Sequence, residues 1–168
     1  MCGIVGTFGV DEKVVKLGVR ALLHRGPDAQ AVKTWGDVTL GHTRLSIIDT
    51  SSASNQPFAF GNVLLSYNGE VWNYVEVKRE LEKIGYRFKT KGDTEVLAAA
   101  IQAWDWEAFD RLQGMWAVAW TKDQGKTLNL CRDRFGEIPV HYANESGRTW
   151  FASETKALRA MGAPSSLW

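Results

Sequence analysis

The second residue of the chain could supply both the nucleophile and the base of a hydrolytic reaction. The sequence begins Met1-Cys2-Gly3-Ile4-Val5-Gly6. We expect Met1 to be removed, because cysteine is small, and Cys2 then has both a thiol and a free α-amine. A thiolate is a nucleophile, and an α-amine with a pKa of about 7.7–8.0 is partly neutral base near neutral pH. Nucleophile and base would lie on one residue, although a cysteine here can also be incidental, at the start of a strand.

Other residues of nucleophilic or metal-binding type are few. The cysteines Cys2 and Cys131 are too few for a disulfide framework, and a bond between them would block the nucleophile, so we expect a reducing compartment. Cys131 lies in an apolar strand pattern and is expected to be buried and inert. His24, His42 and His141 have no Cys, Asp or Glu at ligand spacing, so no metal site is expected.

Length and composition indicate one globular domain. The 168 residues, 45% hydrophobic and 23% charged, suffice for one core. A net charge of +1 without a dense Lys/Arg run argues against nucleic acid or an anionic membrane as main partner. No apolar run approaches the ~18 residues of a membrane span, and we expect no signal peptide before Cys2. The expected location is cytoplasmic.

The elements of the N-terminal half must place Cys2 at the end of a strand. Residues 2–8 are apolar with interspersed glycines and predict a short strand. Asp11 is the predicted cap of a helix that runs from Glu12 to about His24. Its predicted core face is Val14, Leu17, Ala21 and Leu22. Hairpins are predicted for strands 31–35 and 38–48, and for strands 58–60 and 63–67.

The remaining elements are helices followed by a run of hairpins. Asn73, with Glu76 in a capping box, predicts a helix that stops at Gly85. Phe88 marks a short predicted strand, Asp93 opens a second helix, and residues 106–112 form a short third one. Strands are predicted at 115–121, 127–132, 140–143 and 149–152, and a last helix at 155–161. Two sheets packed together with helices outside satisfy this pattern.

Eight segments occur in a fixed order and together resemble one family. They are Met1–Gly6, His24–Asp28, Gly41–Asp49, Tyr67–Asn73, Gly92–Val96, Leu112–Trp116, Arg132–Gly136 and Phe151–Leu158. In this order they resemble the class II glutamine amidotransferase domain of glutamine-dependent asparagine synthetases. The resemblance covers nearly the whole chain, and its strength lies in the combination, since each segment alone would be weak.

The resemblance implies an α+β fold and an enzymatic activity. The implied fold is that of the N-terminal-nucleophile hydrolases, a four-layer αββα sandwich of two mostly antiparallel sheets. It would occupy residues 1–161, followed by a short tail at 162–168. The implied activity is hydrolysis of L-glutamine to glutamate and ammonia through a γ-glutamyl thioester on Cys2.

The resemblance also implies an oxyanion site and a clamp for the substrate. Asn68, through its side-chain NH₂, and Gly69, through its N–H, would bind the oxyanion, each worth about 3–4 kcal/mol of barrier. Arg44 would hold the α-carboxylate and Asp93 the α-ammonium. From the local sequence alone, Asn68 and Gly69 could instead form a turn at the end of a strand. Arg44 could be a surface arginine, and Asp93 could be the cap of a helix. The other implied pocket residues are Leu45, Ser46, Ile47, Ile48 and Glu70.

The loop that contains Arg25 and Gly26 is implied to be a lid. In the family this loop, just before Pro27, closes over bound glutamine and excludes water. Locally the same residues could be only the stop of a helix.

The family's synthetase domain is expected to be absent. The chain stops at Trp168 and has no Ser-Gly-Gly segment or G-x-x-x-x-G-K-[ST] loop for ATP. ATP and magnesium are therefore expected only with a partner synthetase, and this chain is expected to need no cofactor. It is either a fragment or a free-standing glutaminase that passes ammonia to a separate synthetase subunit. Glu137 and His141 depart from the family pattern, which puts the partner surface in doubt rather than catalysis.

Two other functions stay open. One is a catalytically silent, glutamine-binding or regulatory subunit, and the other is an N-terminal-nucleophile hydrolase that acts on peptides or other amides. Retention of the nucleophile, the oxyanion residues and the clamp favours the enzyme over the silent subunit. A charged clamp for a free amino acid argues against a peptide substrate.

Overall fold

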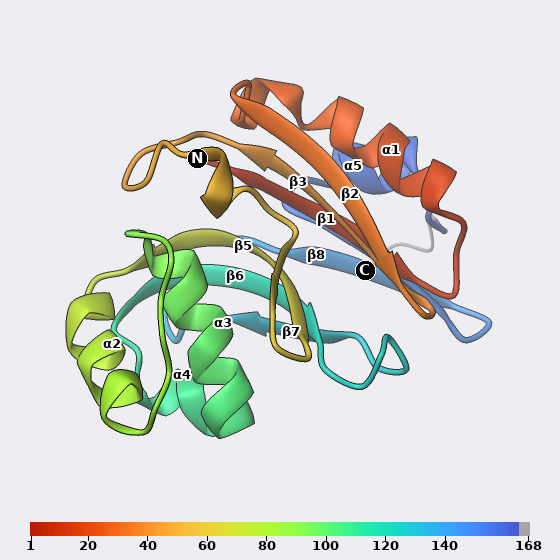
Figure 1. The fold of residues 1–168 in the computed structure, drawn as a ribbon. Coiled ribbons are helices and arrows are strands. Elements are labelled where there is room, and N and C mark those ends of the chain that lie inside the picture. Colours follow the sequence, from red (N-terminus) through yellow and green to blue (C-terminus); the bar gives the residue numbers. More distant parts are fainter. Residues whose placement is uncertain (165–168) are drawn as a thin grey trace.

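The computed structural model describes residues 1–164 as two antiparallel sheets packed face to face (Figure 1). The first sheet has, in strand order, β2 (Ala29–Trp35), β3 (Val38–Arg44), β1 (Gly3–Phe8), β9 (Arg148–Ala152) and β8 (His141–Glu145). The second has β4 (Phe58–Phe60), β5 (Val63–Val71), β6 (Gly114–Thr121) and β7 (Asn129–Arg132). The strand that follows Cys2 is therefore the middle strand of its sheet.

Helices cover the outer side of both sheets. The first sheet is covered by α1 (Glu12–Ala21) and α5 (Thr155–Ala160), and the second by α2 (Tyr74–Lys83), α3 (Asp93–Trp104) and the short α4 (Ala108–Arg111). Short 3₁₀ turns occur at Leu23–Arg25, Ser52–Ser54 and Asp105–Glu107. This order of layers confirms the predicted αββα sandwich.

Strand alternation divides the core into three apolar layers. In β1, Ile4 lies between the sheets whereas Val5 packs beneath α1, because successive side chains point to opposite faces. In β5, Leu64 lies between the sheets and Leu65 packs against α3. The site is thus built on strands that are fixed on both faces.

The first helix begins at Glu12 as predicted, but it ends at Ala21 instead of about His24, and its predicted buried face is partly wrong. Asp11 caps α1, since its Oδ1 accepts a hydrogen bond from the Lys13 N–H at 2.8 Å. Leu17, predicted to face the core, is 46% exposed, whereas Val15 and Gly18 are buried. Gly18 has no side chain, and a Cβ there would collide with Val5, so the helix lies closest to β1 along this face.

The second helix starts as predicted but is capped differently. Asn73 makes no side-chain hydrogen bond to α2, so the predicted capping box with Glu76 is wrong. Instead, Asn73 Nδ2 donates to the Arg111 carbonyl and Asn73 Oδ1 accepts from the Gln113 N–H, both at 2.9 Å. The side chain therefore ties the start of α2 to the segment that leads into β6.

Several predicted boundaries shift. The hairpins around Gly36 and Gly61 form, but β3 ends at Arg44 instead of residue 48, and β5 continues to Val71. The strand predicted at Phe88 does not form. Residues 165–168 of the predicted tail lie outside the described part of the chain.

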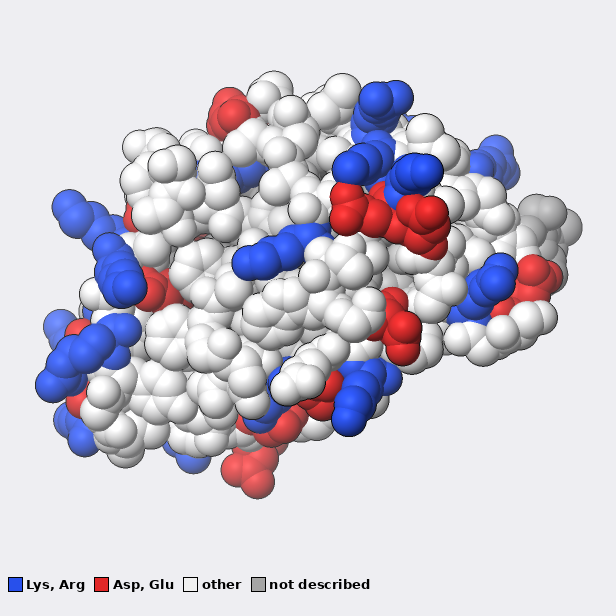
Figure 2. All heavy atoms as spheres, turned by 45° about the vertical axis from the view of Figure 1, so that its right-hand side comes forward, with Lys and Arg blue, Asp and Glu red and all other residues white. Residues whose placement is uncertain are grey.

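One face of the molecule carries both positive and negative side chains. Figure 2 shows Lys and Arg side chains interspersed with Asp and Glu around one face, with uncharged surface between them. Across residues 1–164, no helix has the length and apolar character needed to cross a membrane.

Candidate active site

A pocket of about 150 Å³ opens where β1 begins and brings most of the predicted site together. The predicted residues that line it are Cys2, Arg44, Leu45, Ile47, Ile48, Asn68, Gly69, Glu70 and Asp93. Residues that sequence analysis did not assign also line it, among them Met1, Asp49, Gln56, Tyr67, Met115 and Ile138. Segments far apart in the sequence therefore meet around one thiol.

The thiol of Cys2 lies against the main chain that follows β3. Its Sγ is 3.4 Å from the Leu45 nitrogen, which donates to it, and 3.6 Å from the Leu45 carbonyl. Burial raises the pKa of Cys2, while the Leu45 N–H, the chain-terminal amine and Arg44 act to lower it. The thiol therefore keeps its proton near neutral pH and needs a base. Met1 precedes it and lines the pocket, so the Cys2 nitrogen is an amide until Met1 is removed.

Hydrogen bonds with Arg25 and Ser153 hold the main chain around Cys2. Arg25 Nε donates to the Cys2 carbonyl at 2.8 Å, and Arg25 Nη1 donates to Glu154 at 2.9 Å. Ser153 makes two hydrogen bonds to Ile4, two residues after Cys2: its hydroxyl accepts from the Ile4 N–H at 3.0 Å, and its own N–H donates to the Ile4 carbonyl at 2.9 Å. The position of the nucleophile is thus fixed by the far end of the chain.

The residues predicted as a lid lie beside the pocket rather than in its lining. Arg25 is the last residue of a 3₁₀ turn, and its side chain donates a hydrogen bond to the Cys2 carbonyl. Gly26 lies against Thr43, and a Cβ at this position would collide with the Thr43 main chain. A closing movement of this segment stays a prediction.

Asn68 carries an unpaired donor inside the pocket. The residue is only 3% exposed, and its Nδ2 makes no hydrogen bond among residues 1–164. A buried polar group without a partner is uncommon in native proteins. Gly69 follows it with φ +157°, and a Cβ there would collide with the Met115 carbonyl, which explains glycine at this position. An amide donor and a bare backbone therefore stand side by side near Cys2.

Arg44 is buried at the end of β3 and organises the loop that follows. Its Nη1 donates to the Ser51 carbonyl and to Asn55 Oδ1, both at 2.7 Å, and its Nη2 donates to the Asp49 carbonyl. The guanidinium retains further N–H donors for a carboxylate. Arg44 therefore both shapes the pocket wall and presents positive charge to it.

Asp93 adds a carboxylate to the lining of the pocket. It is the first residue of α3 and is 6% exposed. Burial raises the pKa of Asp93, whereas hydrogen bonds from the Val71 N–H and the Tyr67 hydroxyl favour the charged form. A cation and an anion thus flank the space next to Cys2, as a zwitterionic amino acid requires.

Two residues differ from the predicted lining of the pocket: Ser46 was predicted and is absent, and Gln56 was not predicted and is present. Ser46 does not line the pocket; its N–H donates to Asp28 Oδ2 at 2.7 Å. Gln56 was not predicted, yet it lines the pocket and its Oε1 accepts the Tyr67 N–H at 2.6 Å. No pattern in the sequence around Gln56 points to the site, because its role depends on a strand that comes later in the chain.

His42 is a structural residue in this arrangement. It is fully buried, and burial lowers its pKa to about 4, so it is neutral. Its Nε2 donates to the Tyr67 carbonyl at 3.1 Å, which joins β3 to β5 across the two sheets. Within the described residues, no cluster of three or more His, Cys, Asp and Glu side chains could hold a metal ion.

Comparison with known proteins gives a consistent picture. The family model described as "Glutamine amidotransferase domain" matches residues 1–166. Asparagine synthetase [glutamine-hydrolyzing] 1 of Bacillus subtilis is 37% identical over 94% of this chain and 26% of its own length. A putative asparagine synthetase [glutamine-hydrolyzing] 2 of Methanocaldococcus jannaschii is 31% identical over 96% of this chain and 35% of its own length. The chain therefore spans only about a quarter to a third of these relatives.

Solved structures agree with the fold. The glutamine phosphoribosylpyrophosphate amidotransferase of B. subtilis, complexed with ADP and GMP, matches with a TM-score of 0.81 and 25% identity. The match covers 96% of this chain and 44% of that one. A second structure, titled as the allosteric regulatory enzyme of purine biosynthesis, matches with a TM-score of 0.82 and 24% identity, which supports the fold alone.

Proposed function

Because the chain belongs to the glutamine amidotransferase domain family, we propose that it hydrolyses glutamine to glutamate and ammonia through a thioester on Cys2. The buried, unpaired amide of Asn68 in the pocket of Cys2 is the observation that carries this proposal. A donor without a partner in the free protein is available to an oxygen that becomes negative during the reaction. Preorganised donors of this kind supply much of the rate enhancement in acyl transfer.

The first half of the reaction forms the thioester. With Met1 removed, the free α-amine of Cys2 takes the thiol proton, and the sulfur attacks the side-chain amide carbon of glutamine. The carbonyl oxygen becomes an oxyanion that Asn68 Nδ2 and the Gly69 N–H stabilise. When the carbon–nitrogen bond breaks, the leaving nitrogen takes the proton from the α-ammonium of Cys2 and departs as ammonia.

The second half returns the enzyme to its starting state. The α-amine removes a proton from water, and the resulting hydroxide attacks the thioester carbon. The carbon–sulfur bond breaks, glutamate leaves, and the sulfur regains a proton from the amine. Because burial raises the pKa of Cys2, the thiolate is not preformed, so the mechanism depends on this amine.

The test is the intact mass of the purified chain before and after treatment with an electrophilic glutamine analogue. We expect loss of Met1 and a single adduct, blocked by excess glutamine. Cys2→Ala should abolish both the adduct and glutamine turnover while leaving the circular dichroism spectrum unchanged, and Cys131→Ala is the matched control that keeps both. A retained Met1 or an unmodified Cys2 would instead favour a catalytically silent, glutamine-binding subunit.

The proposed recipient of the ammonia is an ATP-dependent synthetase that forms an amide, with ATP and magnesium bound there. The support is that relatives named asparagine synthetase match this chain over about a quarter to a third of their own length. Glutamine with heavy nitrogen in its side-chain amide should label asparagine made by an ammonia-using synthetase when this chain is present. Cys2→Ala should remove the label, while added ammonium chloride should restore asparagine synthesis. Labelling that is equally strong with Cys2→Ala would contradict the proposal.

A further inference from the structure

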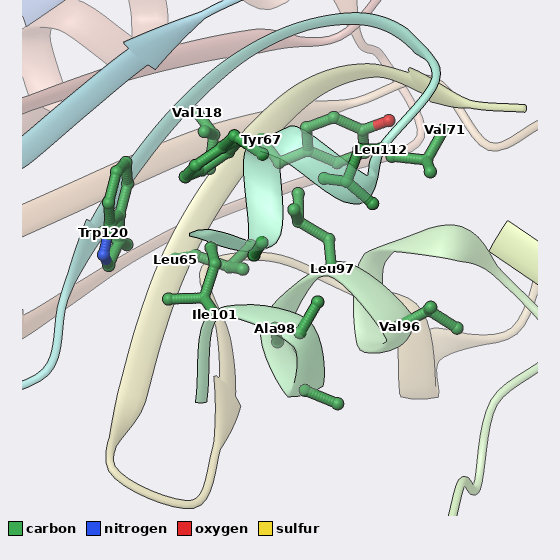
Figure 3. Close-up of a cluster of buried hydrophobic side chains, with 14 of the residues drawn as sticks. Leu65, Tyr67, Val71, Val96, Leu97, Ala98, Ile101, Leu112, Val118 and Trp120 are labelled. Carbon is green, nitrogen blue, oxygen red and sulfur yellow. The ribbon is translucent and has the colours of Figure 1, made fainter. Parts of the chain in front are cut away.

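Tyr67 lies directly before Asn68, yet its side chain contacts α3 instead of the oxyanion site. Strand alternation turns Tyr67 toward α3, whereas Leu64 and Ser66 of the same strand face the other sheet. Figure 3 shows the Tyr67 ring within the apolar cluster and its hydroxyl oxygen on the side of Val71. The residue is 2% exposed, so a hydroxyl at this depth needs a polar partner.

That partner is Asp93. The Tyr67 hydroxyl donates to Asp93 Oδ2 at 2.8 Å, and the Val71 N–H donates to the same oxygen at 3.0 Å. Both bonds fall on one oxygen of the carboxylate, which fixes its rotation about the side-chain bond. The other oxygen, Oδ1, is then the one available to a ligand.

The main chain of Tyr67 is fixed as firmly as its side chain. Its N–H donates to Gln56 Oε1 at 2.6 Å, and its carbonyl accepts from His42 Nε2 at 3.1 Å. The ring is buried in the apolar cluster between β5 and α3, so the hydroxyl is held in place by packing as well. Tyr67 therefore acts as a rigid support that links β5, which contains Asn68 and Gly69, to the first turn of α3.

The protonation states of Tyr67 and Asp93 suit a hydrogen bond from a neutral phenol to a charged carboxylate. Burial and the nearby Asp93 raise the pKa of Tyr67 well above 10, so the phenol keeps its proton. Burial also raises the pKa of Asp93, and the hydrogen bonds from Tyr67 and Val71 oppose this rise. A carboxylate has to be charged to attract an ammonium group, so the phenol supports both its direction and its charge.

We propose that Tyr67 is a positioning residue for substrate binding, whose hydroxyl holds Asp93 so that Oδ1 meets the α-ammonium of glutamine. This inference rests on the proposed glutamine hydrolysis. It adds the group that holds Asp93, which together with Arg44 is proposed to bind the α-amino and α-carboxyl groups of glutamine. Because Tyr67 touches the carboxylate rather than the reacting amide, its loss weakens recognition of the free amino acid and spares the chemical step.

The experiment compares Tyr67→Phe with the wild-type chain on two substrates. One is glutamine, and the other is glutaramate, which has the same side-chain amide and terminal carboxylate but no α-ammonium. We expect the KM for glutamine to rise about tenfold in the variant, as for loss of a hydrogen bond to a charged group, with kcat changed less than about threefold. The kcat/KM for glutaramate should also change less than about threefold, because it lacks the group that Asp93 binds.

The pH profile gives a second readout. Without the phenol, the pKa of Asp93 rises further, so the acid limb of kcat/KM for glutamine should move to higher pH in Tyr67→Phe. The other charged or titratable groups that line the pocket are Cys2, Arg44, Asp49 and Glu70, and the variant leaves all of them in place. A purely structural defect would lower activity without moving this limb.

The control is Tyr86→Phe, which removes a phenol from a residue stacked on Phe60, away from the pocket. It should match the wild type in every measurement, and thermal unfolding should show that both variants are folded. Equal losses on glutamine and glutaramate, or an unchanged KM and acid limb, would overturn the inference. A wild-type chain without glutaminase activity would instead overturn the proposed function. Should Tyr67→Phe fail to fold, Tyr67→His takes its place, because its side chain can also donate to Asp93. That variant has to keep the wild-type ratio of kcat/KM for glutamine to kcat/KM for glutaramate.

Discussion

Asn68 supplies a donor that the free protein leaves unused, and its role can be isolated by truncation. Asn68→Ala should lower kcat for glutamine by about 100- to 1000-fold with little change in KM, because the proposed role of the amide is to stabilise the oxyanion and not the ground state. Steady-state ammonia release measures both constants. Asn62→Ala, at the exposed turn between β4 and β5, is the matched control and should behave as wild type. A raised KM at unchanged kcat would assign Asn68 to substrate binding instead.

Arg44, unlike Asn68, has two roles: it is proposed to bind the α-carboxylate of glutamine, and it supports the loop after β3. Arg44→Ala should raise the KM for glutamine at least thirtyfold, since removing one partner of a buried charge pair costs about 2 kcal/mol or more. Alkylation of Cys2 by iodoacetamide should slow by no more than about threefold. An equal loss of glutamine binding and of thiol reactivity would count against the carboxylate role. Arg148→Ala, on exposed surface, should change neither.

At this scale, the sequence predicted the residues that converge but not the bonds that orient them. Cys2, Arg44, Asn68 and Asp93 could be assigned because a family resemblance carries over residue by residue. The contact between Tyr67 and Asp93 could not, since it joins positions 26 residues apart and depends on how α3 packs on β5. Propensity and periodicity contain no information about such a contact.

The junction between β9 and α5 holds the N-terminal strand through a cluster of charges. Glu154 accepts from Arg25 Nη1 and His24 Nε2, both at 2.9 Å, and lies 3.1 Å from Lys156 Nζ. These partners lower the pKa of Glu154 to about 2. A lowered carboxyl pKa stabilises the fold above the unfolded-state value and loses that stabilisation as the pH falls through the folded-state value.

Glu154→Gln should therefore reduce the free energy of unfolding by about 2–3 kcal/mol at neutral pH. In the wild type this contribution should disappear as the pH falls from about 4.5 to about 2, while the variant should lack that part of the acid dependence. Denaturant titrations at a series of pH values measure it. Glu80→Gln removes an exposed ion pair with Arg111 and should leave the curve unchanged. If both variants show the same acid dependence, Glu154 is not a stabilising group.

Element boundaries show where local pattern fails. Leu45, Ile47 and Ile48 are apolar and extend the strand pattern, yet β3 ends at Arg44. The guanidinium of Arg44 binds the carbonyls of Asp49 and Ser51 and so shapes the loop that follows. Ile47 is consequently 75% exposed at the pocket rim. Asn73 likewise binds a distant segment rather than its own helix. In both cases a tertiary hydrogen bond overrides a correct local preference.

At the scale of the whole molecule, the interface between the sheets carries the stability on which the site depends. Leu64→Ala, at a fully buried position between the sheets, should lower the free energy of unfolding by about 2–5 kcal/mol. Leu17→Ala makes the same change at a position that is 46% exposed on α1, and it should cost about 0.5 kcal/mol or less. Chemical denaturation compares the two. Equal losses would mean that the sheets do not share a packed core.

The layered architecture was predictable because alternation, turn residues and resemblance agree. The glycine-rich strand at the N-terminus has apolar residues on both faces, which places it between a helix and another sheet, as β1 is found. The face of α1 was not predictable at Leu17, because several apolar residues compete for the core and only close contact at Gly18 decides among them.

The position of Met1 at the pocket has a practical consequence for anyone who produces this protein. An affinity tag fused before Cys2 would convert the amine into a peptide bond and occupy the space beside the thiol. On the proposed mechanism, a tagged preparation would fold normally and yet be inert toward glutamine, as a zymogen is. A protease that cuts immediately before Cys2 would act as its activator.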